Sequence, residues 1–199
     1  MKRLRPIIKN LPGKLEHIKA EKFQGSRCSS IRLYVMDESR FGLLSIQRRC
    51  LTARGTKPLV PYQHRFQNFY LFGAYNPLSG DHFTLELPKC NSECFQLWMD
   101  EFSRHCSEEF KIIILDNGAF HKSKDLKVPD NIALLFLPPY SPELNPAEMI
   151  WRHIKDRIAN IAFESLEKLS DTIAAIVKNL SPQTIRSITG WSLYTNSIV

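Results

Sequence analysis

A proline-rich arm at residues 136–148 (FLPPYSPELNPAE) restricts the backbone more than any other segment of this chain of 199 residues. Each proline ring fixes φ and disfavours helix in the residue before it, so the arm is predicted to be extended or turned. It leads from an apolar run at 132–137 into a helix start, with Asn145 as the predicted N-cap, Pro146 as the first helical residue and Glu148 in the first turn. The arm therefore places the carboxylate of Glu148 beside the end of a buried strand.

Two further acidic residues follow apolar runs. Asp37 comes directly after residues 31–36, and Asp116 comes directly after residues 111–115. Carboxylates are the ligands that Mg²⁺ and Mn²⁺ prefer, so three acids at three element ends predict a metal site. Each acid also has a simpler interpretation. Asp37 and Asp116 would then be turn formers at strand ends, and Glu148 would be the capping-box partner of Asn145.

The remaining patterns predict an α/β fold, a mixed sheet flanked by helices on both faces. Strands are expected at 31–36, 41–46, 68–75, 82–87, 111–115 and 132–137, and helices at 14–22, 92–106, 146–162, 166–180 and 182–189. Residues 47–58 are expected to form a basic loop or hairpin tip that turns near Gly55. In the helix at 146–162, the predicted buried stripe is Ile150, Ile154, Ile158 and Ile161.

Charge is distributed unevenly along the chain, whose net charge is +7. Residues 1–27 hold 8 Lys/Arg against 2 acids, residues 40–80 hold 6 against none, and residues 81–110 hold 7 acids against 2 bases. This pattern favours a face that binds a polyanion such as DNA over a uniformly solvated basic surface. The candidate DNA-binding residues are Arg48, Arg49, Arg54, Lys57, Lys122, Lys124, Arg152 and Lys155.

The 5 cysteines are irregularly spaced and include no C-x-x-C pair. Cys90, Cys94, His105 and Cys106 are an alternative zinc-binding set, but their spacing fits no zinc finger or ribbon, so ordinary thiols are favoured. The sequence has neither an apolar run of membrane-spanning length nor the apolar region of a signal peptide. We therefore expect a cytoplasmic protein with no membrane partner.

Three segments resemble, in order, the catalytic motifs of the DDE transposases, specifically the mariner-like branch found in bacterial insertion sequences. They are residues 36–42 (MDESRFG), 115–123 (LDNGAFHKS) and 137–151 (LPPYSPELNPAEMIW). The resemblance covers roughly residues 30–190. The interval between the second and third motifs is slightly shorter than is usual in that branch, which predicts a short loop at 124–130.

The resemblance implies a ribonuclease H-like catalytic domain at 30–199. Asp37, Asp116 and Glu148 fall on the family's catalytic, metal-binding triad, with Asp37 as the carboxylate shared by a pair of Mg²⁺ or Mn²⁺ ions. By their positions just after Asp116, Asn117 and His121 are expected to support the site, with a loop-surface position as the alternative for His121. Tyr140 and Trp151 are expected to be packing residues in preference to base-stacking ones. The implied reaction is cleavage of DNA at element ends, followed by attack of the freed 3′-hydroxyl on target DNA.

The resemblance also implies that the chain binds DNA and forms a homodimer in a synaptic complex. It further implies a bacterial protein associated with the nucleoid. Residues 1–29 are expected to be a basic linker or arm, because the helix-turn-helix region usual in the family is absent from this sequence. In the family, the helix-turn-helix region recognises the terminal repeats of the element. Here this recognition half would be separately encoded, lost by truncation or left out of a fragment. The alternatives are a non-catalytic DNA-binding remnant and a two-metal nuclease that acts on another nucleic acid.

Overall fold

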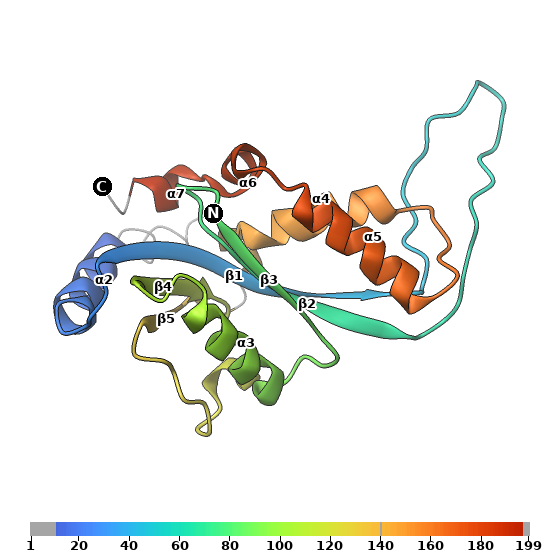
Figure 1. Ribbon diagram of the computed structural model, residues 1–199. Helices are drawn as coiled ribbons and strands as arrows, with labels where there is room; N and C mark the ends of the chain where they lie inside the picture. Colours follow the sequence, from blue (N-terminus) through green and yellow to red (C-terminus); the bar gives the residue numbers. More distant parts are fainter. Residues whose placement is uncertain (1–10, 140, 197–199) are drawn as a thin grey trace.

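A mixed sheet organises the residues that the computed structural model describes, 11–139 and 141–196 (Figure 1). Its 5 strands lie in the order β3-β2-β1-β4-β5. They are β1 (Ser30–Gly42), β2 (Asn68–Tyr75), β3 (His82–Leu87), β4 (Glu109–Leu115) and β5 (Ile132–Phe136). The pairs β1–β2 and β2–β3 are antiparallel, whereas β1–β4 and β4–β5 are parallel.

β1 is one long central strand, so the prediction of separate strands at 31–36 and 41–46 is wrong. Its pairing with β4 ends at Val35, but its pairing with β2 continues from Val35 through Gly42. Pairing with β2 keeps the polar residues after residue 36 extended. Read locally, the same residues suggest that the strand ends there. Asp37 therefore lies within β1, just beyond the last residue that pairs with β4.

The helices follow the predicted positions with shifted ends, except α7, which was not predicted. They are α2 (Leu11–Ile18), α3 (Ser92–Arg104), α4 (Ala147–Ile158), α5 (Leu166–Lys178), α6 (Pro182–Thr189) and α7 (Ser192–Thr195). The π-helix η1 (Lys19–Phe23) and the 3₁₀ helices η2 (Ala119–Lys122) and η3 (Pro142–Leu144) are further short helical segments. None of the helices in the described ranges is long and apolar enough to span a bilayer.

α4 stops earlier than the pattern predicts. Asn160 adopts a left-handed conformation (φ 63°) just after the helix, which turns the chain away from the helix axis. Ile150, Ile154 and Ile158 are buried as expected, but Ile161 lies beyond the turn and is 43 % exposed. The predicted buried stripe is therefore correct only as far as Ile158.

Both faces of the sheet are covered, which confirms the predicted mixed sheet between helices (Figure 1). α3 packs Phe95, Trp98 and Phe102 against one face, and α4, α5 and α6 cover the other. Leu15 of α2 is also buried in this second core, so part of the predicted arm packs against the domain. The division at residues 29 and 30 stays a prediction, and residues 1–10 of the arm lie outside the described ranges.

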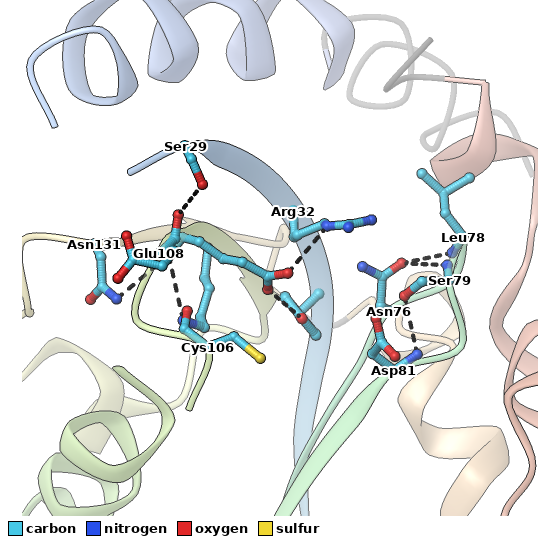
Figure 2. A network of polar contacts seen from close by, with 12 residues as sticks. Ser29, Arg32, Asn76, Leu78, Ser79, Asp81, Cys106, Glu108 and Asn131 are labelled. Atoms are coloured by element: carbon cyan, nitrogen blue, oxygen red, sulfur yellow. Dashed lines mark hydrogen bonds and ion pairs between the residues drawn. The ribbon is translucent and has the colours of Figure 1, made fainter. Parts of the chain in front are cut away.

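Polar contacts hold together the starts of the parallel strands, at the edge of the sheet away from Asp116 (Figure 2). The Ser29 hydroxyl donates to the Glu108 carbonyl oxygen (3.3 Å), and Arg32 pairs with the Glu109 carboxylate (3.4 Å). The Asn131 amide donates to the Glu109 carbonyl oxygen (3.5 Å). These bonds link the start of β1 to the start of β4, and that of β4 to the segment leading into β5.

A side chain stabilises the turn after β2. The Asn76 side-chain oxygen accepts from the backbone N–H groups of Leu78 (2.8 Å) and Ser79 (2.9 Å) (Figure 2). Gly80 completes the turn with φ 81°, and a Cβ at that position would lie 2.2 Å from the Pro182 carbonyl oxygen. Glycine is required here for both its conformation and its lack of a side chain.

Candidate active site

The three predicted acids line one pocket at the carboxyl end of the parallel strands. Asp37 comes from β1, Asp116 follows β4 and Glu148 lies in the first turn of α4. The pocket has a volume of about 470 Å³, and part of its wall is the proline-rich arm. Residues that are distant in the sequence therefore meet around one cavity.

Asn145 fixes the start of α4 against β1. Its side-chain N–H donates to the Met36 carbonyl oxygen (2.9 Å), and its side-chain oxygen accepts from the Ala147 N–H (3.2 Å). The helix begins at Ala147 with Pro146 in the capping position, one residue later than predicted, because the buried Asn145 bridges two elements. Glu148 lies in the first turn as expected.

The capping-box interpretation of Glu148 is not supported by the contacts. The Asn145 backbone N–H donates to the Pro142 carbonyl oxygen (2.9 Å) instead of to a glutamate side chain. Within residues 11–139 and 141–196, the Glu148 carboxylate accepts no hydrogen bond. It remains available to the pocket that it lines.

Asp37 is the most deeply buried acid of the three. The Trp151 indole N–H donates to its Oδ2 (2.8 Å). Burial raises the pKa of Asp37 well above its usual range, and the nearby negative charges of Glu38, Glu148 and Asp116 raise it further. The pocket therefore holds more negative charge than its own hydrogen bonds offset, which favours a cation.

Asp116 has the opposite electrostatic environment. Its Oδ1 accepts from the Gly118 N–H (2.9 Å) and lies 2.9 Å from Nδ1 of His121. The His121 contact is an ion pair whose N–H direction is not aligned as a hydrogen bond. His121 and the Gly118 N–H hold the pKa of Asp116 below its usual value. Asp116 is therefore ionised and has one oxygen already anchored.

Glu38 is a fourth carboxylate that the sequence analysis missed. Its Oε1 lies 2.8 Å from Nε2 of His121, and their side chains are 8 % and 1 % exposed. Burial lowers the pKa of His121, but its contacts with Asp116 and Glu38 outweigh burial and raise the pKa to about 9. The position of Glu38 next to Asp37 could have identified it. Adjacent residues of a strand point to opposite faces, so Glu38 lies on the face covered by α3 when Asp37 lies on the other.

His121 and Asn117, the two predicted supporting residues, both lie at the site. His121 is buried between Glu38 and Asp116, as described above. The Asn117 side-chain N–H donates to the Leu137 carbonyl oxygen, and the Leu137 N–H donates to the Leu115 carbonyl oxygen (2.8 Å). Asn117 thus joins the segment after β4 to the proline-rich arm.

The predicted basic residues are only partly gathered at the pocket. Lys122 lines it, and Lys155 is close enough for the charges of Glu148 and Asp37 to act on its ammonium group. Lys124 is exposed outside the pocket lining. Arg48 and Arg152 both face Asp156, at 2.9 and 4.0 Å.

The other three predicted bases, Arg49, Arg54 and Lys57, lie in the long exposed loop between β1 and β2. This loop projects away from the sheet (Figure 1). The structure therefore does not bring them together with the acids.

A divalent cation fits the donor chemistry of the pocket. Hard cations prefer carboxylate oxygens, and three carboxylates, those of Asp37, Asp116 and Glu148, line this pocket. Within the described ranges, however, no three His, Cys, Asp or Glu side chains stand close enough to hold a metal ion. Among those residues, neither the carboxylate pocket nor the alternative set of three cysteines and His105 forms such a cluster. Mutual repulsion keeps bare carboxylates apart, and one oxygen of each aspartate is already held by a ring nitrogen.

The sequence matches a known family over most of its length. The model of the DDE superfamily endonuclease family matches residues 32–170. This chain belongs to the DDE superfamily endonucleases. The resemblance drawn from the three motifs is thereby confirmed at the level of the superfamily.

This DDE endonuclease is also similar to a curated protein of Sinorhizobium fredii (strain NBRC 101917 / NGR234). The two are 40 % identical over 102 residues, which is 50 % of this chain and 76 % of the relative. That relative is described as uncharacterized protein y4pE/y4sA.

Solved structures of the Mos1 transposase share the fold. The Mos1 strand transfer complex superposes with a TM-score of 0.64 at 14 % identity, covering 97 % of this chain and 59 % of that one. The Mos1 mariner paired end complex with Mn gives 0.63 at 17 % identity, covering 91 % and 56 %. The DDE endonuclease thus has the predicted ribonuclease H-like fold, and it spans little more than half the length of these chains.

Proposed function

We propose that this DDE endonuclease is the catalytic domain of a transposase. It would cut DNA at the ends of a mobile element and join the freed 3′-hydroxyl to target DNA. The observation that carries the proposal is the single pocket lined by Asp37, Asp116 and Glu148 from three separate segments. The family match and the shared fold with Mos1 support it.

In this proposal, Asp37, Asp116 and Glu148 hold Mg²⁺ or Mn²⁺. When bound, a pair of such ions supplies activation of the attacking oxygen and stabilisation of the leaving oxygen of a phosphodiester. Asp37 and Asp116 each keep one carboxylate oxygen fixed by a protein contact. The other oxygen is left for the cation. Glu148 contributes a carboxylate without a competing hydrogen bond in the described ranges.

Substrate contacts belong to the same proposal. Lys122 in the pocket lining and Lys155 beside it would meet the backbone phosphates near the reacting bond. Arg48, Arg49, Arg54 and Lys57 would hold DNA further from the pocket. Pairing of two element ends requires a second copy of the chain, and sequence-specific recognition would come from a helix-turn-helix half.

Glu148→Gln tests the proposal. Glutamine is nearly isosteric and Glu148 accepts no hydrogen bond in the described ranges, so the melting temperature should stay close to that of the parent. A neutral amide attracts a divalent ion weakly. Joining of a pre-nicked DNA end should therefore fall by more than about 100-fold, because even residues that only support metal ligands contribute 10–100-fold.

Glu143→Gln is the matched control. Glu143 is exposed in η3, on the same arm, and does not line the pocket. This variant should join DNA like the parent. Parent-like joining by Glu148→Gln would contradict the proposed function.

A further inference from the structure

One oxygen of Asp37 is held by a buried indole. The Trp151 Nε1–H donates to Asp37 Oδ2 over 2.8 Å, and the Trp151 side chain is only 2 % exposed. The ring is fixed by edge contacts with Phe41 and Tyr75, at centroid distances of 6.3 and 5.7 Å. A buried ring in two such contacts has little freedom, so the N–H direction, and with it the carboxylate plane, is set by packing.

The sheet leaves room for this ring at a glycine. Gly73 pairs with Asp37 across β1 and β2. A Cβ at Gly73 would lie 2.7 Å from Trp151 Cη2 and 2.5 Å from the Tyr75 hydroxyl oxygen. The indole can therefore reach Asp37 only because its β2 partner has no side chain.

The same helix presents both the indole and a second acid. Trp151 follows Glu148 by three positions, so the two are neighbours on one side of α4. Asn145, just before α4, is bonded to the carbonyl oxygen of Met36, the residue that precedes Asp37. Two hydrogen bonds thus connect α4 to the segment of β1 that carries Asp37, one through the backbone and one through the carboxylate.

We propose that Trp151 is a positioning residue for the active site. Its indole N–H holds Oδ2 of Asp37 so that Oδ1 is left for the cation. Because Trp151 shares α4 with Glu148, it also sets the spacing between these two carboxylates. The inference rests on the proposed function, in which Asp37 holds a divalent cation. Mere packing requires the ring of Trp151 but not its N–H.

Trp98 offers a matched control for the loss of that N–H. It is also buried, with 0 % exposure, and its Nε1 has no hydrogen-bond partner among the described residues. Trp151→Phe and Trp98→Phe remove the same atoms from the core. Only the first removes a hydrogen bond to a carboxylate.

Mn²⁺ binding, measured by electron paramagnetic resonance, separates the two roles. We expect Trp151→Phe to weaken Mn²⁺ binding by about 10–100-fold, as is usual when a support of a metal ligand is lost. Trp98→Phe should bind Mn²⁺ like the parent, and the melting temperature should fall further in Trp151→Phe, which alone loses a hydrogen bond. Equal Mn²⁺ affinity in the two variants would overturn the positioning role.

A second measurement on the parent keeps the test decisive if Trp151→Phe does not fold. In ¹⁵N-indole spectra, Mg²⁺ should move the Trp151 N–H resonance and leave that of Trp98 in place. An unmoved Trp151 resonance at saturating Mg²⁺ would overturn the inference.

Asp37→Asn distinguishes the positioning role of Trp151 from the proposed function of the pocket. Loss of Mn²⁺ binding in Asp37→Asn together with parent-like binding in Trp151→Phe would remove the positioning role alone. Parent-like binding in Asp37→Asn would remove the proposed function itself.

Discussion

Glu38 and His121 form a buried ion pair beside the carboxylate pocket. Their closest atoms are 2.8 Å apart, and both side chains are almost completely shielded from water. Removing one partner of a buried pair strands the other in a medium that solvates it poorly. The pair therefore stabilises the local fold as well as supporting Asp116.

This pairing leads to a stability prediction. Glu38→Ala should lower the free energy of unfolding by about 3 kcal/mol, the cost typical of breaking a buried pair. Glu38→Gln should cost less, because its amide oxygen still accepts from Nε2 of His121. Urea unfolding would measure both. The exposed Glu143→Ala is the control, with an expected change within about 0.5 kcal/mol, and a Glu38→Ala as stable as this control would refute the pairing.

The sequence predicts some of these residues and not others. Asp37, Asp116 and Glu148 sit in motifs that can be identified locally. Glu38 and Trp151 gain their roles from contacts with residues 83 and 114 positions away. No local pattern contains such contacts, so Trp151 was predicted only to pack, and Glu38 was not singled out.

At the scale of elements, Asn160 anchors the base of the β1–β2 loop. Its N–H donates to the Ile46 carbonyl oxygen (2.8 Å), and its side chain exchanges two hydrogen bonds with the Arg48 backbone (2.9 and 3.1 Å). The left-handed conformation of Asn160 directs these groups toward the loop. The connection after α4 thus holds a loop that leaves the body of the molecule.

Asn160→Gly should loosen this base selectively. Glycine adopts a positive φ without strain, so the variant should lose only the side-chain hydrogen bonds, about 1 kcal/mol each. Hydrogen exchange at the Arg48 amide should accelerate by about 5-fold or more, as expected for 1 kcal/mol of lost protection. Asn179→Ala removes a comparable exposed bond to Ala175 and should leave Arg48 unchanged. Equal exchange at Arg48 in both variants would argue against the anchor.

Elements whose ends carry a local sequence signal, such as a capping residue or a proline, were predictable. The helices expected to start at residues 92 and 182 do so: the Asn91 side chain caps α3, and Pro182 is the first residue of α6. β1 was not predictable in full, because its continuation past Asp37 depends on pairing with β2. Tertiary hydrogen bonds there outweigh a local preference for a turn.

At the scale of the molecule, the exposed β1–β2 loop concentrates unpaired positive charge. Arg49, Arg54 and Lys57 are exposed and form no ion pair with any described residue. Such side chains bind phosphate backbones and release counterions, which makes binding sensitive to salt.

Replacing these three residues by Ala should lower the slope of log affinity against log salt by about 3, roughly one per phosphate contact. Filter binding with mixed-sequence DNA would measure it. A triple Ala variant of Arg104, Lys168 and Lys178, on α3 and α5, changes the net charge equally and should alter the slope by less than about 1. Equal slopes for both variants would exclude the loop as a DNA-binding segment.

The order of the pocket residues along the chain has a consequence for biosynthesis. A growing polypeptide presents Asp37 and Asp116 before Glu148, and Trp151 follows Asp37 by 114 positions. The parallel pairing of β1 with β4 likewise joins segments far apart in sequence, which makes its formation slow. We therefore expect the carboxylate pocket of a ribosome-bound nascent chain to stay incomplete until α4 has been released and has docked.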